Sequence, residues 1–146
     1  MLTGIEIYAD AAEISDIRRL NSDSTIQGFT TNPTLMRQSG ISNYGTFARQ
    51  ALSEAGSKPV SLEVVADDCE KMVTQGQMLD SLGSNVVVKV PITTSTGQTC
   101  IPVVRRLLDD GIRVNVTAVT TLNQVQEIQR NLDASDPVIV SILAGR

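Results

Sequence analysis

The 146-residue chain contains no histidine, no tryptophan and only two cysteines. The lack of histidine excludes Ser–His and Cys–His nucleophile pairs and any histidine metal site. Proton transfer in an enzyme of this sequence would therefore rest on carboxylates, lysine, tyrosine or water. Cys69 and Cys100 lie far apart without the spacing of metal ligands, which favours a reduced cytosolic setting and predicts two ordinary packing residues.

Positive charge and long apolar runs are also scarce. A formal net charge of −4 argues against nucleic acid or an anionic membrane surface as the main partner. No apolar run reaches the length of a membrane span, and the first residues show no basic segment followed by an apolar signal core. With 41% hydrophobic and 19% charged residues, the composition predicts one globular domain, residues 1–146, in the cytoplasm.

Strand-like and helix-like segments alternate along the chain. Runs rich in β-branched residues predict strands at residues 5–10, 26–31, 60–64, 86–90, 113–119 and 137–143. Apolar residues three and four apart predict helices between them, and the short connections indicate right-handed βαβ units in a parallel sheet. We expect Asp67 to cap the helix after the third strand. The helix after the fourth strand is expected to begin near Thr99, because Pro102 suits only a first turn.

A parallel sheet of this kind belongs either to an open doubly wound fold or to a (β/α)₈ barrel. A dinucleotide-binding fold needs a glycine-rich turn after its first strand, where this sequence has Asp10-Ala11-Ala12-Glu13. Polar residues stand at the ends of all six predicted strands, where a barrel gathers them on one face, so the TIM-barrel type of α/β fold is favoured. These residues are Asp10, Thr30, Asn32, Glu63, Lys89, Asn115, Thr117 and Ser141.

Lys89 is the most unusual of them, since it is one of three lysines and lies among four valines in the segment Val86–Pro91. Such a run predicts a strand buried on both faces. Desolvation lowers the pKa of a lysine, and a neutral amine is the nucleophile that forms a Schiff base with a carbonyl substrate. The plainer alternatives are a lysine that reaches water from an edge strand and one paired with a structural carboxylate. The polar ends of the neighbouring strands favour the functional interpretation.

Five segments in chain order, preceded by Asp10, resemble the transaldolase family, which includes the small transaldolases and the fructose-6-phosphate aldolases. They are Thr30-Thr31-Asn32-Pro33-Thr34-Leu35, Ser61-Leu62-Glu63-Val64, Val87-Val88-Lys89-Val90-Pro91, Asn115-Val116-Thr117, and Ser141 with Gly145-Arg146. The first and third are the most specific. The resemblance implies a (β/α)₈ barrel and class I aldol chemistry on sugar phosphates, with no metal and no cofactor.

The resemblance also implies a role for each matching residue. Lys89 attacks the ketose carbonyl and forms the imine that stabilises the carbanion after carbon–carbon cleavage. Asp10 accepts the proton of the sugar hydroxyl whose loss opens that bond, while Glu63 and Thr117 hold the water that shuttles protons. The positions implied to bind substrate are Thr30, Asn32, Asn115 and Ser141 around the dihydroxyacetone unit and Arg146 at the phosphate.

The implied activity is that of a cytoplasmic, homo-oligomeric transaldolase of the pentose phosphate pathway. Transaldolases resemble this chain in carrying glutamate at Glu63, where the fructose-6-phosphate aldolases carry glutamine, so transfer is favoured over free aldol cleavage. After Ser141 the family pattern continues with proline and an aromatic residue, but Ile142 and Leu143 stand here.

Length is the larger departure from the family. A full barrel has eight strands, so strands seven and eight are expected to be missing, either because the chain is a fragment or because a second chain supplies them. An open sheet would expose unpaired edges. A catalytically inactive partial barrel that serves as an assembly module is therefore the alternative from another functional class.

Overall fold

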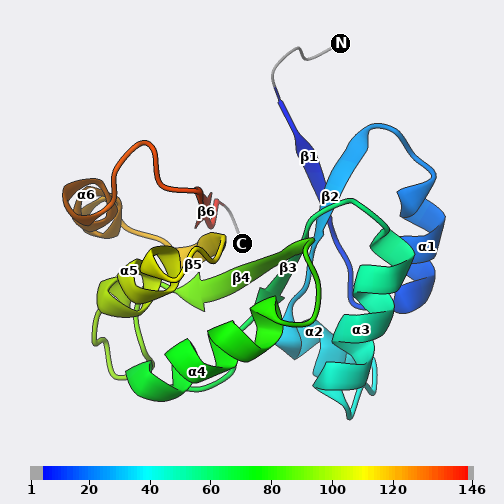
Figure 1. The fold of residues 1–146 in the computed structure, drawn as a ribbon, viewed down its shortest axis with the longest axis horizontal. Coiled ribbons are helices and arrows are strands. Elements are labelled where there is room, and N and C mark those ends of the chain that lie inside the picture. Colours follow the sequence, from blue (N-terminus) through cyan, green and yellow to red (C-terminus); the bar gives the residue numbers. More distant parts are fainter. Residues whose placement is uncertain (1–4, 145–146) are drawn as a thin grey trace. The chain divides into compact units, whose positions relative to one another are not determined.

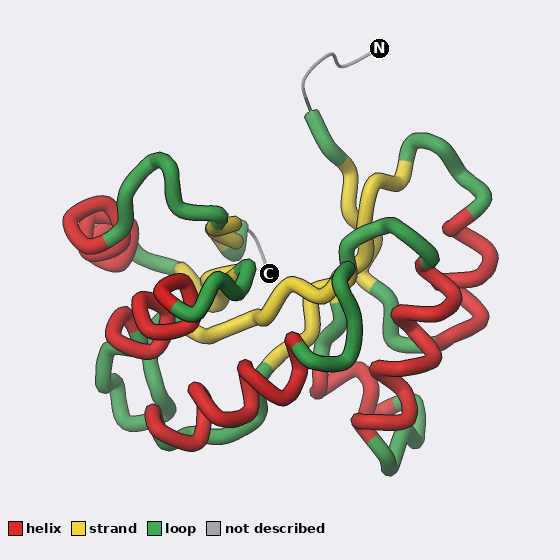
Figure 2. Tube along the Cα trace, viewed as in Figure 1, coloured by secondary structure: helices red, strands yellow, loops and turns green. Residues whose placement is uncertain are grey.

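The computed structural model of the chain describes residues 5–144, without the side chain of Leu35 (Figure 1). Strands alternate with helical segments in the described residues, as the sequence predicts, with two successive helices between the second and third strands (Figure 2). The contacts between residues group the chain into two compact units. The first unit consists of the residues up to Glu63 together with Ser81–Val86, and the second of Val64–Asp80 together with the residues from Val87 onward.

The first unit holds three parallel strands and three helices. Its elements are β1 (Ile7–Asp10), α1 (Ile14–Asn21), β2 (Ile26–Thr30), α2 (Pro33–Gln38), α3 (Tyr44–Ala55) and β3 (Val60–Glu63). β2 pairs with β1 on one side and β3 on the other, with Thr30 level with both Asp10 and Ser61. Asp10, Thr30 and Ser61 therefore stand at one level, and Glu63 ends β3 two residues beyond it.

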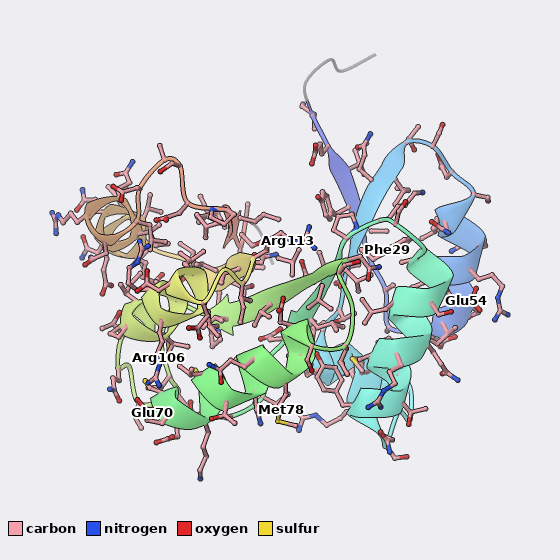
Figure 3. The ribbon with its side chains drawn as sticks, in the orientation of Figure 1. Phe29, Glu54, Glu70, Met78, Arg106 and Arg113 are labelled. Carbon is pink, nitrogen blue, oxygen red and sulfur yellow. The ribbon has the colours of Figure 1, made fainter. Side chains whose placement is uncertain are left out.

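Helices α1 and α3 pack against each other beside these strands (Figure 1). Asn43 caps α3, because its side chain accepts a hydrogen bond from the Thr46 N–H at 2.9 Å. Phe29 of β2 is fully buried, whereas Glu54 of α3 lies at the surface with Arg18 at 2.6 Å (Figure 3). Burial of the apolar faces holds this unit together, since exposed ion pairs contribute little.

Gly28 is the one position of β2 where a side chain has no room. A Cβ atom there would lie 2.2 Å from the ring of Tyr8, its partner on β1. The tyrosine ring covers the bare backbone of the glycine, which replaces the packing that a side chain at Gly28 would have supplied.

Asn85 joins the loop after α3 to the loop before β4. Its side-chain amide nitrogen lies 3.4 Å from the carbonyl oxygen of Leu52, 3.0 Å from that of Gly56 and 3.1 Å from that of Lys58. The carbonyl groups at a helix end have no partner within the helix. The Asn85 amide therefore supplies the donors that this end of α3 requires.

The second unit holds the remaining strands and their helices. Its elements are α4 (Cys69–Asp80), β4 (Val86–Pro91), α5 (Ile101–Asp109), β5 (Val114–Val119), α6 (Leu122–Asn131) and β6 (Val138–Ile142). β5 pairs in parallel with β4 and with β6. The valines of β4 are buried, as a strand covered on both faces requires.

Helices α4 and α5 lie alongside each other in the second unit. Gly76 allows this approach, because a Cβ atom there would lie 2.9 Å from both methyl groups of Leu107. Glu70 of α4 and Arg106 of α5 form an ion pair at 3.1 Å on the exposed side of the two helices (Figure 3). α5 begins at Ile101 with Pro102 in its first turn, close to the predicted start.

The predicted cap of α4 is wrong by one residue. Asp68 caps the helix, since its carboxylate accepts a hydrogen bond from the Lys71 N–H at 3.0 Å. Asp67 instead accepts hydrogen bonds from the Ser95 N–H at 2.7 Å and from the Ser95 hydroxyl. These bonds hold the pKa of Asp67 below its usual value. Ser95, which is distant in sequence, therefore engages Asp67, and Asp68 caps the helix.

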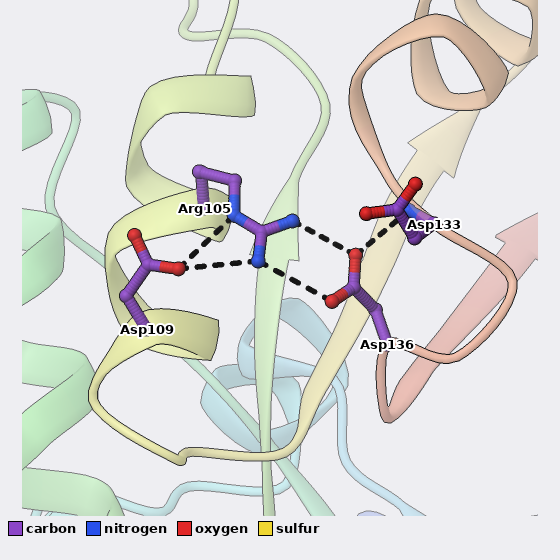
Figure 4. Close-up of polar contacts among 4 residues, drawn as sticks. All are labelled: Arg105, Asp109, Asp133 and Asp136. Carbon is purple, nitrogen blue, oxygen red and sulfur yellow. Dashed lines mark hydrogen bonds and ion pairs between the residues drawn. The ribbon is translucent and has the colours of Figure 1, made fainter.

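The loop between α6 and β6 is held by Arg105 of α5 (Figure 4). Its guanidinium lies 2.8 Å from one carboxylate oxygen of Asp136 and 3.3 Å from the other, and also pairs with Asp109 at 3.1 Å. Asp136 further accepts the Asp133 N–H at 2.8 Å. This backbone bond, followed by that of Arg105, holds the pKa of Asp136 below its usual value. The carboxylate is therefore charged in the folded protein at neutral pH.

Within each unit the strands are parallel and adjacent in chain order, with a helix between successive strands. This is the βαβ pattern of a (β/α)₈ barrel, of which residues 5–144 contain six strands, and it confirms the predicted class of α/β fold. Among residues 5–144, no helix has the length and apolarity needed to cross a membrane.

Candidate functional site

Asp10 and Thr30 meet at the carboxyl ends of β1 and β2. They are partners in the strand register, and the Thr30 hydroxyl donates a hydrogen bond to the Asp10 carboxylate at 3.1 Å. The Ala11 N–H donates to the Thr30 carbonyl oxygen at 2.9 Å, which extends the pairing one residue further. The exposed carboxylate of Asp10 is thus oriented by a neighbouring hydroxyl while it remains open to solvent.

Asn32 follows β2 directly and begins the turn into α2. Its side-chain oxygen accepts a hydrogen bond from the Thr34 N–H at 2.9 Å, and its backbone oxygen accepts one from the Met36 N–H at 2.9 Å. Pro33 occupies the first helical position, where a missing N–H costs nothing. Asn32 therefore serves the helix start, and its role in substrate binding stays a prediction.

Glu63 ends β3, and Tyr44 of α3 holds its backbone. The Tyr44 hydroxyl donates a hydrogen bond to the Glu63 carbonyl oxygen at 3.0 Å. Burial of the phenol raises the pKa of Tyr44 to about 12, more than its hydrogen bonds with Thr31 and Glu63 lower it. The sequence did not predict this contact, since no local pattern joins a helix start to a strand end.

We expect the ionisation of Tyr44 to unfold the first unit at high pH. The folded pKa lies above the ordinary value near 10, so the stabilisation is complete below pH 10 and is lost as pH rises toward 12. The loss amounts to roughly 2–3 kcal/mol. In a Tyr8→Phe variant only Tyr44 titrates, and its ultraviolet absorbance should change with a midpoint near pH 12. A midpoint near pH 10 would contradict the burial of the phenol, and the double variant Tyr8→Phe with Tyr44→Phe provides the blank.

Lys89, Asn115 and Ser141 come together in the second unit. Lys89 is level with Asn115 in the pairing of β4 with β5, and the Ser141 hydroxyl of β6 donates to the Asn115 side-chain oxygen at 2.7 Å. Asn115 is buried with 2% exposure, whereas Lys89 is half-buried among buried valines. The Lys89 carbonyl oxygen also accepts the Val64 N–H at 3.0 Å. An amine and an amide therefore share one level of β4 and β5, and a hydroxyl reaches the amide from β6, two residues beyond that level.

Thr117 lies two residues beyond Asn115, opposite Pro91. The next residue, Ala118, has a φ of 60°, and the register between β5 and β6 shifts between Val116 and Val119. A left-handed conformation is unfavourable for alanine by about 1–2 kcal/mol. Nothing in the sequence signals this bulge, because glycine or asparagine usually marks such a position. The bulge changes the direction of β5 immediately after Thr117.

The predicted site residues thus form two groups. Asp10 and Thr30 hydrogen-bond in the first unit, where Asn32 and Glu63 follow or end their own strands. Lys89, Asn115 and Ser141 group in the second unit, with Thr117 further along β5. Arg146 lies outside the described residues. Carboxylates, a half-buried amine and amide and hydroxyl groups are the functional groups that aldol chemistry without histidine requires.

Comparison with known proteins identifies the family of this chain. The family model described as transaldolase/fructose-6-phosphate aldolase matches residues 7–146. A probable transaldolase of Syntrophobacter fumaroxidans is 35% identical over 117 residues, which are 79% of this chain and 51% of that protein. A probable transaldolase of Erythrobacter litoralis is 38% identical over 122 residues, 82% of this chain and 52% of that protein.

The coverage is similar for a third relative, a probable transaldolase of Thermus thermophilus, which is 33% identical over 82% of this chain and 55% of its own length. The chain therefore spans about half the length of the curated relatives it matches. The match to the family model nevertheless runs from β1 to the last residue and includes every strand end described above. The chain belongs to the transaldolase/fructose-6-phosphate aldolase family.

Proposed function

We propose that this chain carries the Schiff-base half-reaction of a transaldolase, with Lys89 as the nucleophile and a ketose phosphate as the donor substrate. The observation that supports it most directly is the position of Lys89, half-buried in a strand of buried valines and level with Asn115. An amine at the carboxyl end of a barrel strand stands where this fold places catalytic groups. A half-buried lysine can also be purely structural, so the proposal depends as well on the groups that neighbour Lys89.

The neighbouring groups supply the remaining steps of the proposal. The amine of Lys89 adds to the ketose carbonyl, and loss of water gives an imine that accepts the electron pair of the breaking carbon–carbon bond. Asp10 takes the proton of the hydroxyl on the departing carbon. Glu63 and Thr117 hold the water that exchanges protons as the imine forms. Asn32, Asn115 and Ser141, with Thr30 beside Asp10, orient the dihydroxyacetone unit, and Arg146 binds the phosphate.

Transfer to an acceptor aldose phosphate, as in the pentose phosphate pathway, is the favoured outcome. The glutamate at Glu63 supports transfer, because the transaldolases that this chain resembles carry glutamate at this position and the fructose-6-phosphate aldolases carry glutamine. The alternative is release of free dihydroxyacetone, and the family description covers both activities. Measuring free dihydroxyacetone with and without an acceptor aldehyde distinguishes the two.

Trapping of the imine is the direct test. Borohydride reduction in the presence of fructose 6-phosphate should add a three-carbon unit to Lys89 and to neither other lysine. Lys58 and Lys71 are internal controls, because the Lys58 amine donates to the carbonyl oxygens of Asn21 and Asp23 at 2.7 and 3.0 Å and Lys71 is exposed on α4. An unlabelled Lys89 in protein that is folded by circular dichroism would refute the proposal.

Self-association is part of the proposal. β6 presents exposed apolar side chains, among them Ile139 with 39% exposure and Ile142 with 60%, and Leu143 directly after the strand is 53% exposed. Apolar residues along a strand favour burial against another chain. Sedimentation should therefore detect a homo-oligomer. A monodisperse oligomer without imine trapping would instead favour the catalytically inactive assembly module.

A further inference from the structure

The two cysteines of the chain begin neighbouring elements of the second unit. Cys69 is the first residue of α4, and Cys100 is the residue before α5. They are far apart in sequence, and their spacing alone predicts no relation between them. The structure records both as free thiols, Cys69 half-buried and Cys100 fully buried. Neither has a part in the proposed aldol chemistry.

Three contacts hold the start of α4 against the segment that carries Cys100. The Cys100 sulfur lies 3.8 Å from the sulfur of Met72, which is one helical turn from Cys69 and therefore on the same face of α4. Asp67, two residues before Cys69, accepts the Ser95 N–H at 2.7 Å. Glu70 pairs with Arg106 at 3.1 Å. Since the two segments are joined on both sides of the cysteines, we expect the thiols to lie close together.

Burial is the main cause that raises the pKa of Cys100 to about 11, and the nearby Cys69 raises it further. Cys100 is therefore a protonated thiol at neutral pH, enclosed by protein. Cys69 is the more exposed of the two, so an oxidant in solution reaches Cys69 first.

We propose that Cys69 and Cys100 form a reversible disulfide within one chain when a peroxide oxidises Cys69. Cys69 loses its proton and the thiolate attacks a peroxide oxygen, so the O–O bond breaks and Cys69 becomes a sulfenic acid. The hydroxide that leaves takes up the proton that Cys69 lost and becomes water. The Cys100 sulfur then attacks the Cys69 sulfur, the S–O bond breaks, and a second water leaves with the Cys100 proton. Two thiols and one hydrogen peroxide thus give one disulfide and two waters.

Oxidation of the full chain with hydrogen peroxide tests the proposal. Free thiols counted in denaturant should fall from two to none, and the intact mass should fall by two hydrogen atoms. Because Lys71 and Lys89 separate the cysteines, trypsin should release the peptide of Cys69 joined to that of Cys100. Dithiothreitol should restore both thiols. The urea midpoint of the oxidised form should lie above that of the reduced form, since a closed loop constrains the unfolded chain.

Single variants establish the order of the two steps. In Cys100→Ala, peroxide should leave a sulfenic acid on Cys69 that dimedone labels. In Cys69→Ser, the buried Cys100 should react with peroxide at least about tenfold more slowly than Cys69 does in Cys100→Ala. Wild-type protein that gives only disulfide-linked dimers, only sulfinic acid, or two unreacted thiols would overturn the proposal.

Discussion

Replacing Lys89 with arginine is expected to lower the rate of ketose phosphate cleavage by at least about 10³-fold and to abolish borohydride trapping. Arginine keeps the positive charge, but its guanidinium does not lose a proton in proteins and cannot act as the nucleophile. The rate should be measured on purified protein with fructose 6-phosphate, with and without an acceptor aldehyde.

Lys71→Arg is the matched control for this change. Lys71 lies exposed on α4, so the same substitution there should leave the rate within about twofold of the parent. Circular dichroism of both variants shows whether the fold is retained. If Lys89→Arg were folded and kept a rate within tenfold of the parent chain, Lys89 would not be the nucleophile. A purely structural role for Lys89 would then be the better interpretation.

Replacing Asn85 with aspartate is expected to destabilise the first unit by about 3 kcal/mol. The two side chains have nearly the same shape, but aspartate places carboxylate oxygens where an amide now faces the carbonyl oxygens of Leu52, Gly56 and Lys58. The amide N–H donors are lost, and the new carboxylate oxygens repel the carbonyl oxygens that they face. Urea unfolding followed by circular dichroism measures the loss.

The pH dependence of this variant provides a second test. The new carboxyl group gains a raised pKa in the folded state, because its protonated form can donate to a carbonyl oxygen. The variant should therefore be most stable below the unfolded pKa of aspartate and lose stability as pH rises. Asn131→Asp is the control, since that amide donates to the single carbonyl oxygen of Glu127 at 2.8 Å in an exposed position. A cost under about 1 kcal/mol is expected there, and equal costs at both positions would contradict the argument.

The strands were the most predictable part of the fold. β-branched runs such as the valines of β4 identify a strand because their side chains suit an extended, covered backbone. The predicted ends differ from those of the structure by a residue or two, as at β6, where the pairing with β5 covers only Val138–Ile142. The ends of a strand are set by its hydrogen bonds to a neighbouring strand. The sequence of a single segment does not show which of its residues make those bonds.

The strand-end residues were also identified from the sequence, because parallel strands expose their carboxyl ends at one level. What the sequence missed are the residues that support them. Tyr44 holds the Glu63 backbone from the start of another element, and Ala118 adopts a left-handed conformation after Thr117. The choice of Asp68 over Asp67 as helix cap depended on Ser95. In each case the partner lies outside the local pattern.

By itself, the sequence determined the alternation of strands and helices, the barrel type of fold and the family. These follow from periodicity and short motifs, which local sterics and burial dictate. Only the tertiary structure decided which side chains meet: Thr30 with Asp10, Ser141 with Asn115, and Cys100 with Met72. Such pairings are set by helix packing and strand register, which join residues with no regular spacing along the chain.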